Sequence, residues 1–164
     1  MKIAQIRKYD VANGPGIRTT IFVSGCTHNC KKCFNKEYQN FTFGESYNKE
    51  YEELIISYIK DKRVNGFSVL GGEPLQQDDS LYNLLKRVKE ETNKTIWLWS
   101  GYTLEEIVKD TSKKKYLEYI DFLVDGRFEE GKKDFALKFR GSSNQRIIDV
   151  KETIKEKRII IKEI

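Results

Sequence analysis

The feature that most constrains the fold is an alternation of short β-rich runs with longer amphipathic segments. The runs are rich in Val, Ile, Thr, Phe and Trp, the residue types that favour strands. They read TTIFVS (19–24), GFSVL (66–70), TIWLWS (95–100), DFLV (121–124) and QRIIDV (145–150). Between them, residues 48–62 and 78–92 repeat apolar side chains every three or four positions, the spacing of an amphipathic helix. This alternation predicts an α/β fold in which helices cover a parallel sheet.

Helix start signals agree with this pattern. Asp78 or Asp79 is placed to cap the second amphipathic segment. Thr103 is followed three residues later by Glu106, which is the pattern of a capping box. We therefore expect a further helix to begin at residue 104.

Unusual sequences follow the predicted strands. In parallel α/β folds, ligands bind at the carboxyl ends of the strands, on the loops that lead into the helices. Here those loops read GCTHNC (25–30), GGEPL (71–75), SGYT (100–103) and DGRF (125–128). We expect all four loops to face one crevice.

Composition limits the function classes. The 164 residues contain 38% hydrophobic and 34% charged residues, which predicts one folded domain over residues 1–164 with a well-solvated surface. No apolar run approaches the roughly 20 residues that span a bilayer, and the first residues lack the apolar region of a signal peptide. We expect a cytoplasmic protein without a membrane partner. The net charge of +5 is spread along the chain with no aromatic–basic motif, so we expect no nucleic-acid partner.

All three cysteines of the chain, Cys26, Cys30 and Cys33, lie within eight residues. An odd number cannot pair within one chain, and disulfides are rare in the cytosol. Thiolates are soft ligands that favour zinc, copper(I) or iron–sulfur clusters. Three thiolates at C-x3-C-x2-C spacing can hold one cluster and leave one iron without a protein ligand, open to a substrate or cofactor.

Two other interpretations of the cysteines remain open from the spacing. His28 could complete a Cys3His zinc site, but structural zinc ligands usually come as two separated pairs. The spacing therefore favours a cluster, with His28 as a loop residue that lines it. A thiol–disulfide exchanger could use Cys30 and Cys33, but it would leave Cys26 without a role.

The second motif is GGEP, formed by Gly71, Gly72, Glu73 and Pro74 directly after a predicted strand. Paired glycines let a ligand approach the backbone closely, and the carboxylate of Glu73 could bind an ammonium group. The tetrapeptide by itself is also typical of an ordinary turn. Its position one strand–helix–strand step after the cysteine motif makes the combination far more specific.

Together these residues resemble the radical S-adenosylmethionine superfamily, and within it the activating proteins of anaerobic ribonucleotide reductases. The resemblance covers nearly the whole chain. Its motifs are NGPGIRTTIFVSGC (13–26), CTHNCKKCFN (26–35), LGGEPL (70–75), WSGYTLEE (99–106), LVDGRF (123–128) and RGSSNQRIIDV (140–150). One departure is Lys32, which stands before the third cysteine where many members carry an aromatic residue; Phe34 follows that cysteine instead and is expected to shield the cluster.

The resemblance implies a partial (βα)6 barrel and one 4Fe–4S cluster held by Cys26, Cys30 and Cys33. It implies that S-adenosylmethionine chelates the fourth iron and that the GGEP residues contact its methionine amino group. Five more residues are implied as cofactor contacts. They are Ser100 as a further cofactor contact, Asp125 and Arg127 for the ribose hydroxyls and the methionine carboxylate, and Asn144 and Arg146, which would close the crevice.

The implied activity is radical chemistry carried by the cluster and S-adenosylmethionine, with no catalytic acid or base from the protein. The target would be a glycine of the large catalytic subunit of the anaerobic reductase, and the electron source a flavodoxin-type or other low-potential donor. Three alternatives remain. They are activation of another glycyl radical enzyme, action on a small molecule, and a non-enzymatic zinc-binding module, which would be colourless where a cluster protein is brown.

Overall fold

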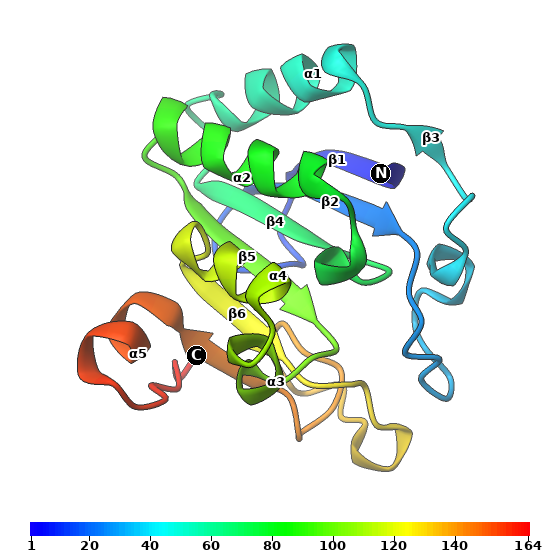
Figure 1. The fold of residues 1–164 in the computed structure, drawn as a ribbon, viewed down its shortest axis with the longest axis vertical. Helices are drawn as coiled ribbons and strands as arrows, with labels where there is room; N and C mark the ends of the chain where they lie inside the picture. The colour runs from blue at the N-terminus through cyan, green and yellow to red at the C-terminus, as the bar shows by residue number, and fades with distance from the viewer.

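A computed structural model describes residues 1–164. Seven strands form one sheet in the order β3–β1–β2–β4–β5–β6–β7 (Figure 1). The strands are β1 (Lys2–Asp10), β2 (Arg18–Ser24), β3 (Glu45–Ser46), β4 (Gly66–Gly71), β5 (Thr95–Ser100), β6 (Phe122–Asp125) and β7 (Arg146–Asp149). The α-helices are α1 (Lys49–Ile59), α2 (Asp79–Glu91), α3 (Leu104–Val108), α4 (Thr111–Lys114) and α5 (Val150–Glu156). Four 3-10 turns complete the list: η1 (Lys36–Gln39), η2 (Pro74–Gln76), η3 (Lys115–Glu118) and η4 (Glu130–Lys132).

The centre of the sheet is parallel. Strands β2, β4, β5 and β6 run in the same direction, which confirms the α/β class and agrees with a partial barrel of the radical S-adenosylmethionine type. The two flanking strands differ, because β1 pairs antiparallel with β2 and β7 pairs antiparallel with β6. The run 145–150 is thus a strand, as predicted, but an antiparallel one. A parallel return needs a crossover, usually helical, whereas the chain between β6 and β7 contains only the short turn η4.

The main core lies between the helices and one face of the sheet. Alternate residues of the central strands, such as Val69 and Leu98, pack against apolar side chains of α1 and α2, such as Ile55 and Leu85. Figure 1 shows α1 and α2 side by side over this face. The opposite, concave face carries a second, smaller cluster built around Trp97. Trp97 is fully buried and belongs to the core of the protein.

The helices begin where the sequence predicted. The Asp78 side chain accepts a hydrogen bond from the backbone N–H of Ser80 at the start of α2. Both bonds of the capping box are present at α3: the N–H of Glu106 donates to Thr103 Oγ1, and the N–H of Thr103 donates to Glu106 Oε2. These caps fix where the loops after β4 and β5 turn into the following helices.

Arg18, which is only 1% exposed, closes the amino ends of the central strands. Its guanidinium donates to Ser68 Oγ at 2.7 Å and to the carbonyls of Phe67 and Thr95, each at 2.9 Å. Burial lowers the pKa of Arg18 to about 10. Gly66 makes room for this side chain, because a Cβ there would lie 2.3 Å from Arg18 Nη1. The closure leaves the carboxyl ends of the strands as the open end of the sheet.

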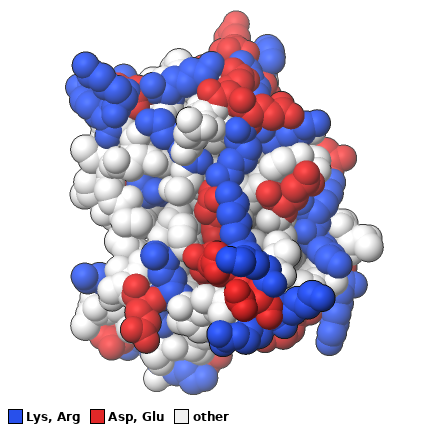
Figure 2. Space-filling model, turned by 90° about the vertical axis from the view of Figure 1, so that its left-hand side faces the viewer, with Lys and Arg blue, Asp and Glu red and all other residues white.

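Charged side chains of both signs are interspersed on the surface, as on the face drawn in Figure 2. On the helices, for example, Arg87 pairs with Glu52, Glu53 and Glu91. Such networks describe a solvated surface rather than a single-sign patch. No helix has the length and apolar character needed to cross a bilayer.

Candidate functional site

A cavity of about 510 Å³ lies at the open end of the sheet. Each of the four loops after the strands contributes to its wall, which confirms that they face one crevice. The contributions are Cys26, His28 and Cys30 from the first loop, Gly71 to Glu73 from the second, Ser100 and Gly101 from the third, and Gly126 and Phe128 from the fourth. Cys33 and Phe34 also line this cavity, so the three thiols share one space with the Gly-Gly-Glu sequence.

The cysteine loop is fixed at its start and tightly wound afterwards. The N–H groups of Gly25 and Cys26 donate to the carbonyls of Tyr38 and Gln39 at 2.7 and 3.0 Å. Asn29 and Lys32 adopt the left-handed backbone conformation, with φ of 53° and 54°. The Cys33 N–H donates to the Cys30 carbonyl at 3.2 Å, and all three cysteines line the cavity.

All three thiols are free and partly buried. Burial raises the pKa of Cys26 to about 11, and it also raises the pKa of Cys30. A metal must therefore displace protons when it binds these sulfurs. No three His, Cys, Asp or Glu side chains converge on a single-ion position in the structure.

The residues present fit the implied cluster and cofactor. The donor set is three soft thiolates in one loop, the set expected for a cluster with one open iron. The backbone of the Gly-Gly-Glu sequence lies directly against this loop: the Glu73 N–H donates to the Gly25 carbonyl at 2.8 Å. A Cβ at Gly72 would lie 2.6 Å from that same carbonyl oxygen. Glycine is therefore required for the two loops to meet.

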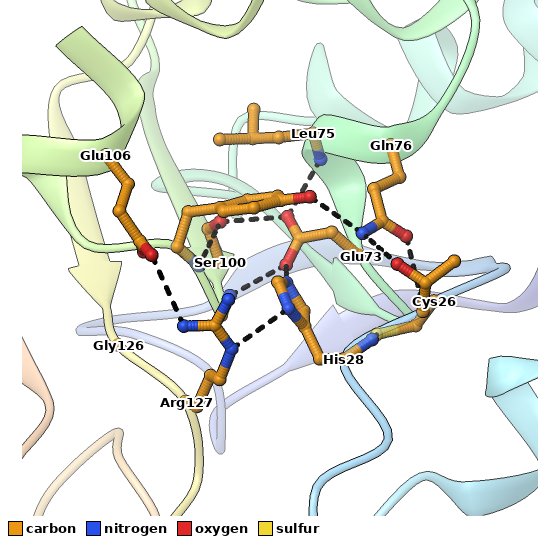
Figure 3. A network of polar contacts seen from close by, with 12 residues as sticks. Cys26, His28, Glu73, Leu75, Gln76, Ser100, Glu106, Gly126 and Arg127 are labelled. Carbon is orange, nitrogen blue, oxygen red and sulfur yellow. Dashed lines mark hydrogen bonds and ion pairs between the residues drawn. The ribbon is translucent and has the colours of Figure 1, made fainter. Parts of the chain in front are cut away.

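His28 connects the cysteine loop to the other loops (Figure 3). Its Nε2 lies 2.9 Å from Glu73 Oε2, and its Nδ1 accepts a hydrogen bond from Arg127 Nε at 3.2 Å. The ring packs against Tyr102 at a centroid distance of 4.5 Å. Since both ring nitrogens have protein partners, neither is directed at a metal. This geometry disfavours the Cys3His zinc site that the sequence left open.

Glu73 is 1% exposed, and its carboxylate is held by four donors. Oε1 accepts from Ser100 Oγ at 2.8 Å and from the Leu75 N–H at 2.9 Å. Oε2 accepts from the Gly101 N–H at 2.7 Å, in addition to its contact with His28. Figure 3 shows these contacts converging on the carboxylate. The site thus presents a rigid carboxylate in the cavity wall, and Ser100 helps to hold it.

The outer predicted residues lie beside the cavity rather than in its wall. Asp125 is buried, accepts from the Leu104 N–H at 2.8 Å, and pairs with Arg146. Arg127 is exposed and lies 3.4 Å from Glu106 in addition to its contact with His28. Asn144 Nδ2 donates to the Arg127 carbonyl at 2.8 Å, while its buried Oδ1 has no partner. The cofactor roles of these four residues stay predictions.

Of two further predicted residues, Phe34 lines the cavity and Pro74 does not. Phe34 stacks on Phe128 at a centroid distance of 4.7 Å, beside the third cysteine. Pro74 is buried at the first position of η2, where its lack of an N–H costs nothing.

Several lining residues carried no clear signal in the sequence. Trp99 lines the cavity, and its Nε1 donates to the Phe139 carbonyl at 2.7 Å. Arg7 of β1 and Arg140 also face this space. The pattern that could have suggested β1 is the polar–apolar alternation of the first ten residues. The segment from Phe128 to Gly141 has neither helical nor strand periodicity, so its contribution could not be predicted.

Three free cysteines and a Gly-Gly-Glu loop at the open end of a largely parallel sheet define an iron–sulfur domain of the radical S-adenosylmethionine type. In agreement, the family model described as "4Fe-4S single cluster domain" matches residues 12–148.

Curated relatives narrow the class. The chain is 45% identical to the anaerobic ribonucleoside-triphosphate reductase-activating protein of Vibrio cholerae over 150 residues, which cover 88% of this chain and 96% of the relative. It is 43% identical to that of Pasteurella multocida, with 88% and 95% covered, and 34% identical to that of Enterobacteria phage T4, with 90% and 93% covered. The chain belongs to the family of anaerobic ribonucleoside-triphosphate reductase-activating proteins.

Proposed function

We propose that this chain activates an anaerobic ribonucleoside-triphosphate reductase by generating a radical on a glycine of the large catalytic subunit. It is an iron–sulfur enzyme of the radical S-adenosylmethionine type with a single 4Fe–4S cluster. The observation that carries the proposal is the shared cavity, in which the three thiols and the Gly-Gly-Glu sequence lie together. The relatives named above are activating proteins for this class of reductase.

In this proposal Cys26, Cys30 and Cys33 hold the cluster, and the Gly71–Glu73 backbone and carboxylate receive the amino group of S-adenosylmethionine. Bound together, the cluster and the cofactor supply one-electron cleavage of a carbon–sulfur bond and abstraction of a hydrogen atom from the glycine. The role of the protein is to orient these groups and to exclude water and oxygen. The half-buried aromatic side chains of the cavity wall, Trp99 and Phe128, suit that role.

The predicted residues beside the cavity have separate proposed roles. Arg127 is exposed and close to His28, so its planar guanidinium can turn toward the cofactor carboxylate. Asn144 Nδ2 donates to the Arg127 carbonyl at 2.8 Å, so Asn144 can hold the loop that carries Arg127 closed over the crevice. Asp125, together with Arg146, fixes the start of α3 and thereby the loop after β5. No step requires a protein acid or base.

Three finer features belong to the same proposal. One continuous sheet supports a single domain over residues 1–164. The electron source is a flavodoxin-type or other low-potential donor, and the place of action is the cytoplasm. The electron donor follows from the family resemblance, and the cytoplasmic location is the one expected from the sequence.

The test is anaerobic reconstitution with iron and sulfide, followed by dithionite and S-adenosylmethionine. We expect a brown protein that forms 5′-deoxyadenosine, and a glycyl radical signal in electron paramagnetic resonance once the large reductase subunit is added. A colourless protein that takes up one zinc and forms no deoxyadenosine would overturn the enzyme assignment. Deoxyadenosine with a radical only on another glycyl radical enzyme would instead correct the partner.

A further inference from the structure

The connection between β6 and β7 forms an irregular lobe at the open end of the sheet. We call residues 128–141 the aromatic lobe, because Phe128, Phe135 and Phe139 all line the cavity. Figure 1 shows this part of the chain beyond the ends of β5 and β6. The stacking of Phe128 on Phe34 places the lobe beside the cysteine loop.

The lobe has a fixed shape although it contains little regular structure. Lys133 and Ser142 form an isolated β-bridge across its base, and the Ser143 N–H donates to the Lys132 carbonyl at 2.9 Å. The Phe139 carbonyl accepts from Trp99 Nε1, although Phe139 itself has a φ of 62°. A non-glycine residue in this strained region persists only where its surroundings hold it. The lobe is therefore built to present particular side chains.

The side chains presented at the cavity mouth are unusually apolar for a surface. Phe135 is 85% exposed and Phe34 is 57% exposed. Lys133 Nζ lies 4.5 Å from the Phe135 ring centroid and 5.3 Å from that of Phe34. The other large exposed apolar residues of the chain do not line this cavity. Exposed aromatic rings beside a cation are the composition of a binding hot spot rather than of solvated surface.

We propose that the aromatic lobe is the docking surface for the glycine-bearing loop of the reductase large subunit, with Phe135 as its exposed anchor. This inference rests on the proposed function. The lobe is continuous with the cavity that holds the thiols, so a glycine that reaches the reacting centre must pass beside it. The part of the wall formed by Gly71 to Glu73 and Ser100 is the part assigned to the small cofactor.

The polar groups near the lobe also fit a polypeptide backbone. Arg7 and Arg140 line the cavity, and the buried Nε of Arg140 has no acceptor in the protein. A loop centred on glycine exposes its backbone carbonyls, which accept hydrogen bonds from such donors. The lobe thus supplies apolar contact through Phe135, while the arginines supply donors for an extended chain.

The test uses the cluster-loaded full chain, S-adenosylmethionine and the purified large reductase subunit under anaerobic conditions. Phe135→Ala should raise the dissociation constant for the reductase at least about 10-fold, as for an interface hot spot. The glycyl radical yield should fall at low reductase concentration and recover at saturation. Lys133→Glu should weaken binding in the same direction. Reductase-free formation of deoxyadenosine should stay within about twofold of the unchanged protein, since Phe135 is not needed to hold the cofactor.

The matched control is Ile154→Ala, which removes a 59% exposed apolar side chain from α5, outside the cavity. It should leave reductase affinity unchanged. A synthetic peptide that contains the radical-bearing glycine should compete with the reductase for the unchanged protein and compete poorly for the Phe135→Ala variant.

Other results would overturn the inference. Unchanged reductase affinity in Phe135→Ala would do so, as would an equal loss of reductase-free cleavage, which would assign the lobe to the cofactor site. A change only in self-association, or only in reduction by a protein electron donor, would assign the lobe to another occupant. If the unchanged protein forms no deoxyadenosine at all, the proposed function fails first. If the unchanged protein forms deoxyadenosine and Phe135→Ala binds the reductase normally, only the docking inference fails.

Discussion

The two ends of the parallel strands are built in opposite ways. At the amino ends, the guanidinium of Arg18 is buried and donates hydrogen bonds to groups on two neighbouring strands. At the carboxyl ends, three thiols lie free around a cavity and two phenylalanines are exposed at its mouth. One end satisfies its own polar groups. The other end leaves its groups available for ligands that come from outside the chain.

Glycines show the same difference. Gly66 at the closed end makes room for the Arg18 side chain, so its role is internal packing. Gly72 at the open end lets two ligand-binding loops touch through their backbones. Stability and function are thus separated along the axis of the parallel strands. Changes at one end should therefore affect stability, and changes at the other should affect ligand binding.

The largest effect should come from the thiols. Changing Cys26, Cys30 or Cys33 to Ala removes a proposed cluster ligand. Loss of a residue that only hydrogen-bonds to a metal ligand already costs a metal site about 10–100-fold in affinity or activity. Formation of deoxyadenosine should therefore fall by more than about 100-fold, because the direct ligand is lost. The free energy of unfolding of the cluster-free protein should change by less than about 1 kcal/mol, since the thiols are only partly buried. Iron content, product chromatography and urea unfolding measure the three quantities. A cysteine variant that retains full activity would show that the thiols at the open end are not needed for the radical chemistry.

Arg18→Met should lower the stability of the fold and leave cluster binding intact. The change leaves the Phe67 and Thr95 carbonyls and Ser68 Oγ without their donor, and we expect a loss of about 3 kcal/mol in unfolding free energy. The folded fraction should still bind its cluster. Urea unfolding checks the first expectation and iron per folded molecule checks the second. Arg18→Lys retains a charge and one donor group, so it should recover part of the stability.

Gly101→Ala tests the link between the open-end loops. A Cβ at Gly101 would lie 2.5 Å from His28 Cδ2, so the ring must move away from Glu73. We expect a stability loss of about 1–2 kcal/mol from this overpacking. Hydrogen exchange should increase in residues 26–33. Gly131→Ala is the matched control, because no atom lies within 4 Å of a Cβ there. Equal effects of the two changes would show that His28 does not tie the loops together.

The smallest effect concerns pH at the closed end. Burial of Asp121 acts to raise its pKa, but hydrogen bonds from Lys151, Lys89 and the Ile96 N–H outweigh burial and hold the pKa below its ordinary value. The folded state thus binds its proton less readily than the unfolded state. The resulting stability is fully present above the unfolded pKa and is lost as pH falls through the folded value.

Urea unfolding between about pH 5 and pH 3 should therefore show a stability that decreases toward acid. Asp121→Asn removes the titrating group, so the acid slope should become shallower in that variant. An unchanged slope would show that Asp121 does not contribute to the acid sensitivity.

The sequence predicted the repeating parts of this fold well. The apolar runs became strands, and the caps at Asp78 and Thr103 lie where the sequence placed them. Local hydrogen bonds determine these features, so local sequence suffices to predict them. The antiparallel direction of β7 was not predicted, because it depends on the path of the twenty residues between β6 and β7, which form no crossover helix.

The site was predictable to a similar degree. The cysteines and the Gly-Gly-Glu sequence were found from spacing, and the structure brings them into one cavity. The aromatic lobe was not found, because its side chains follow neither a helical nor a strand period. The pairing of Asp125 with Arg146 was also beyond reach, since it joins two strands that only the folded sheet makes neighbours.

The sequence by itself determined the chemistry of this protein: three thiols at cluster spacing, a glycine pair with a carboxylate, and alternating strands and helices. These features reside in residue type and short spacing, which a chain carries whether or not it is folded. Only the tertiary structure decided that His28 bonds to Glu73 and Arg127, that Arg18 closes one end of the sheet, and that Phe135 lies at the mouth of the cavity. Contacts between residues far apart in the chain depend on the register of neighbouring strands and on the path of the loops, and both arise only when the chain packs.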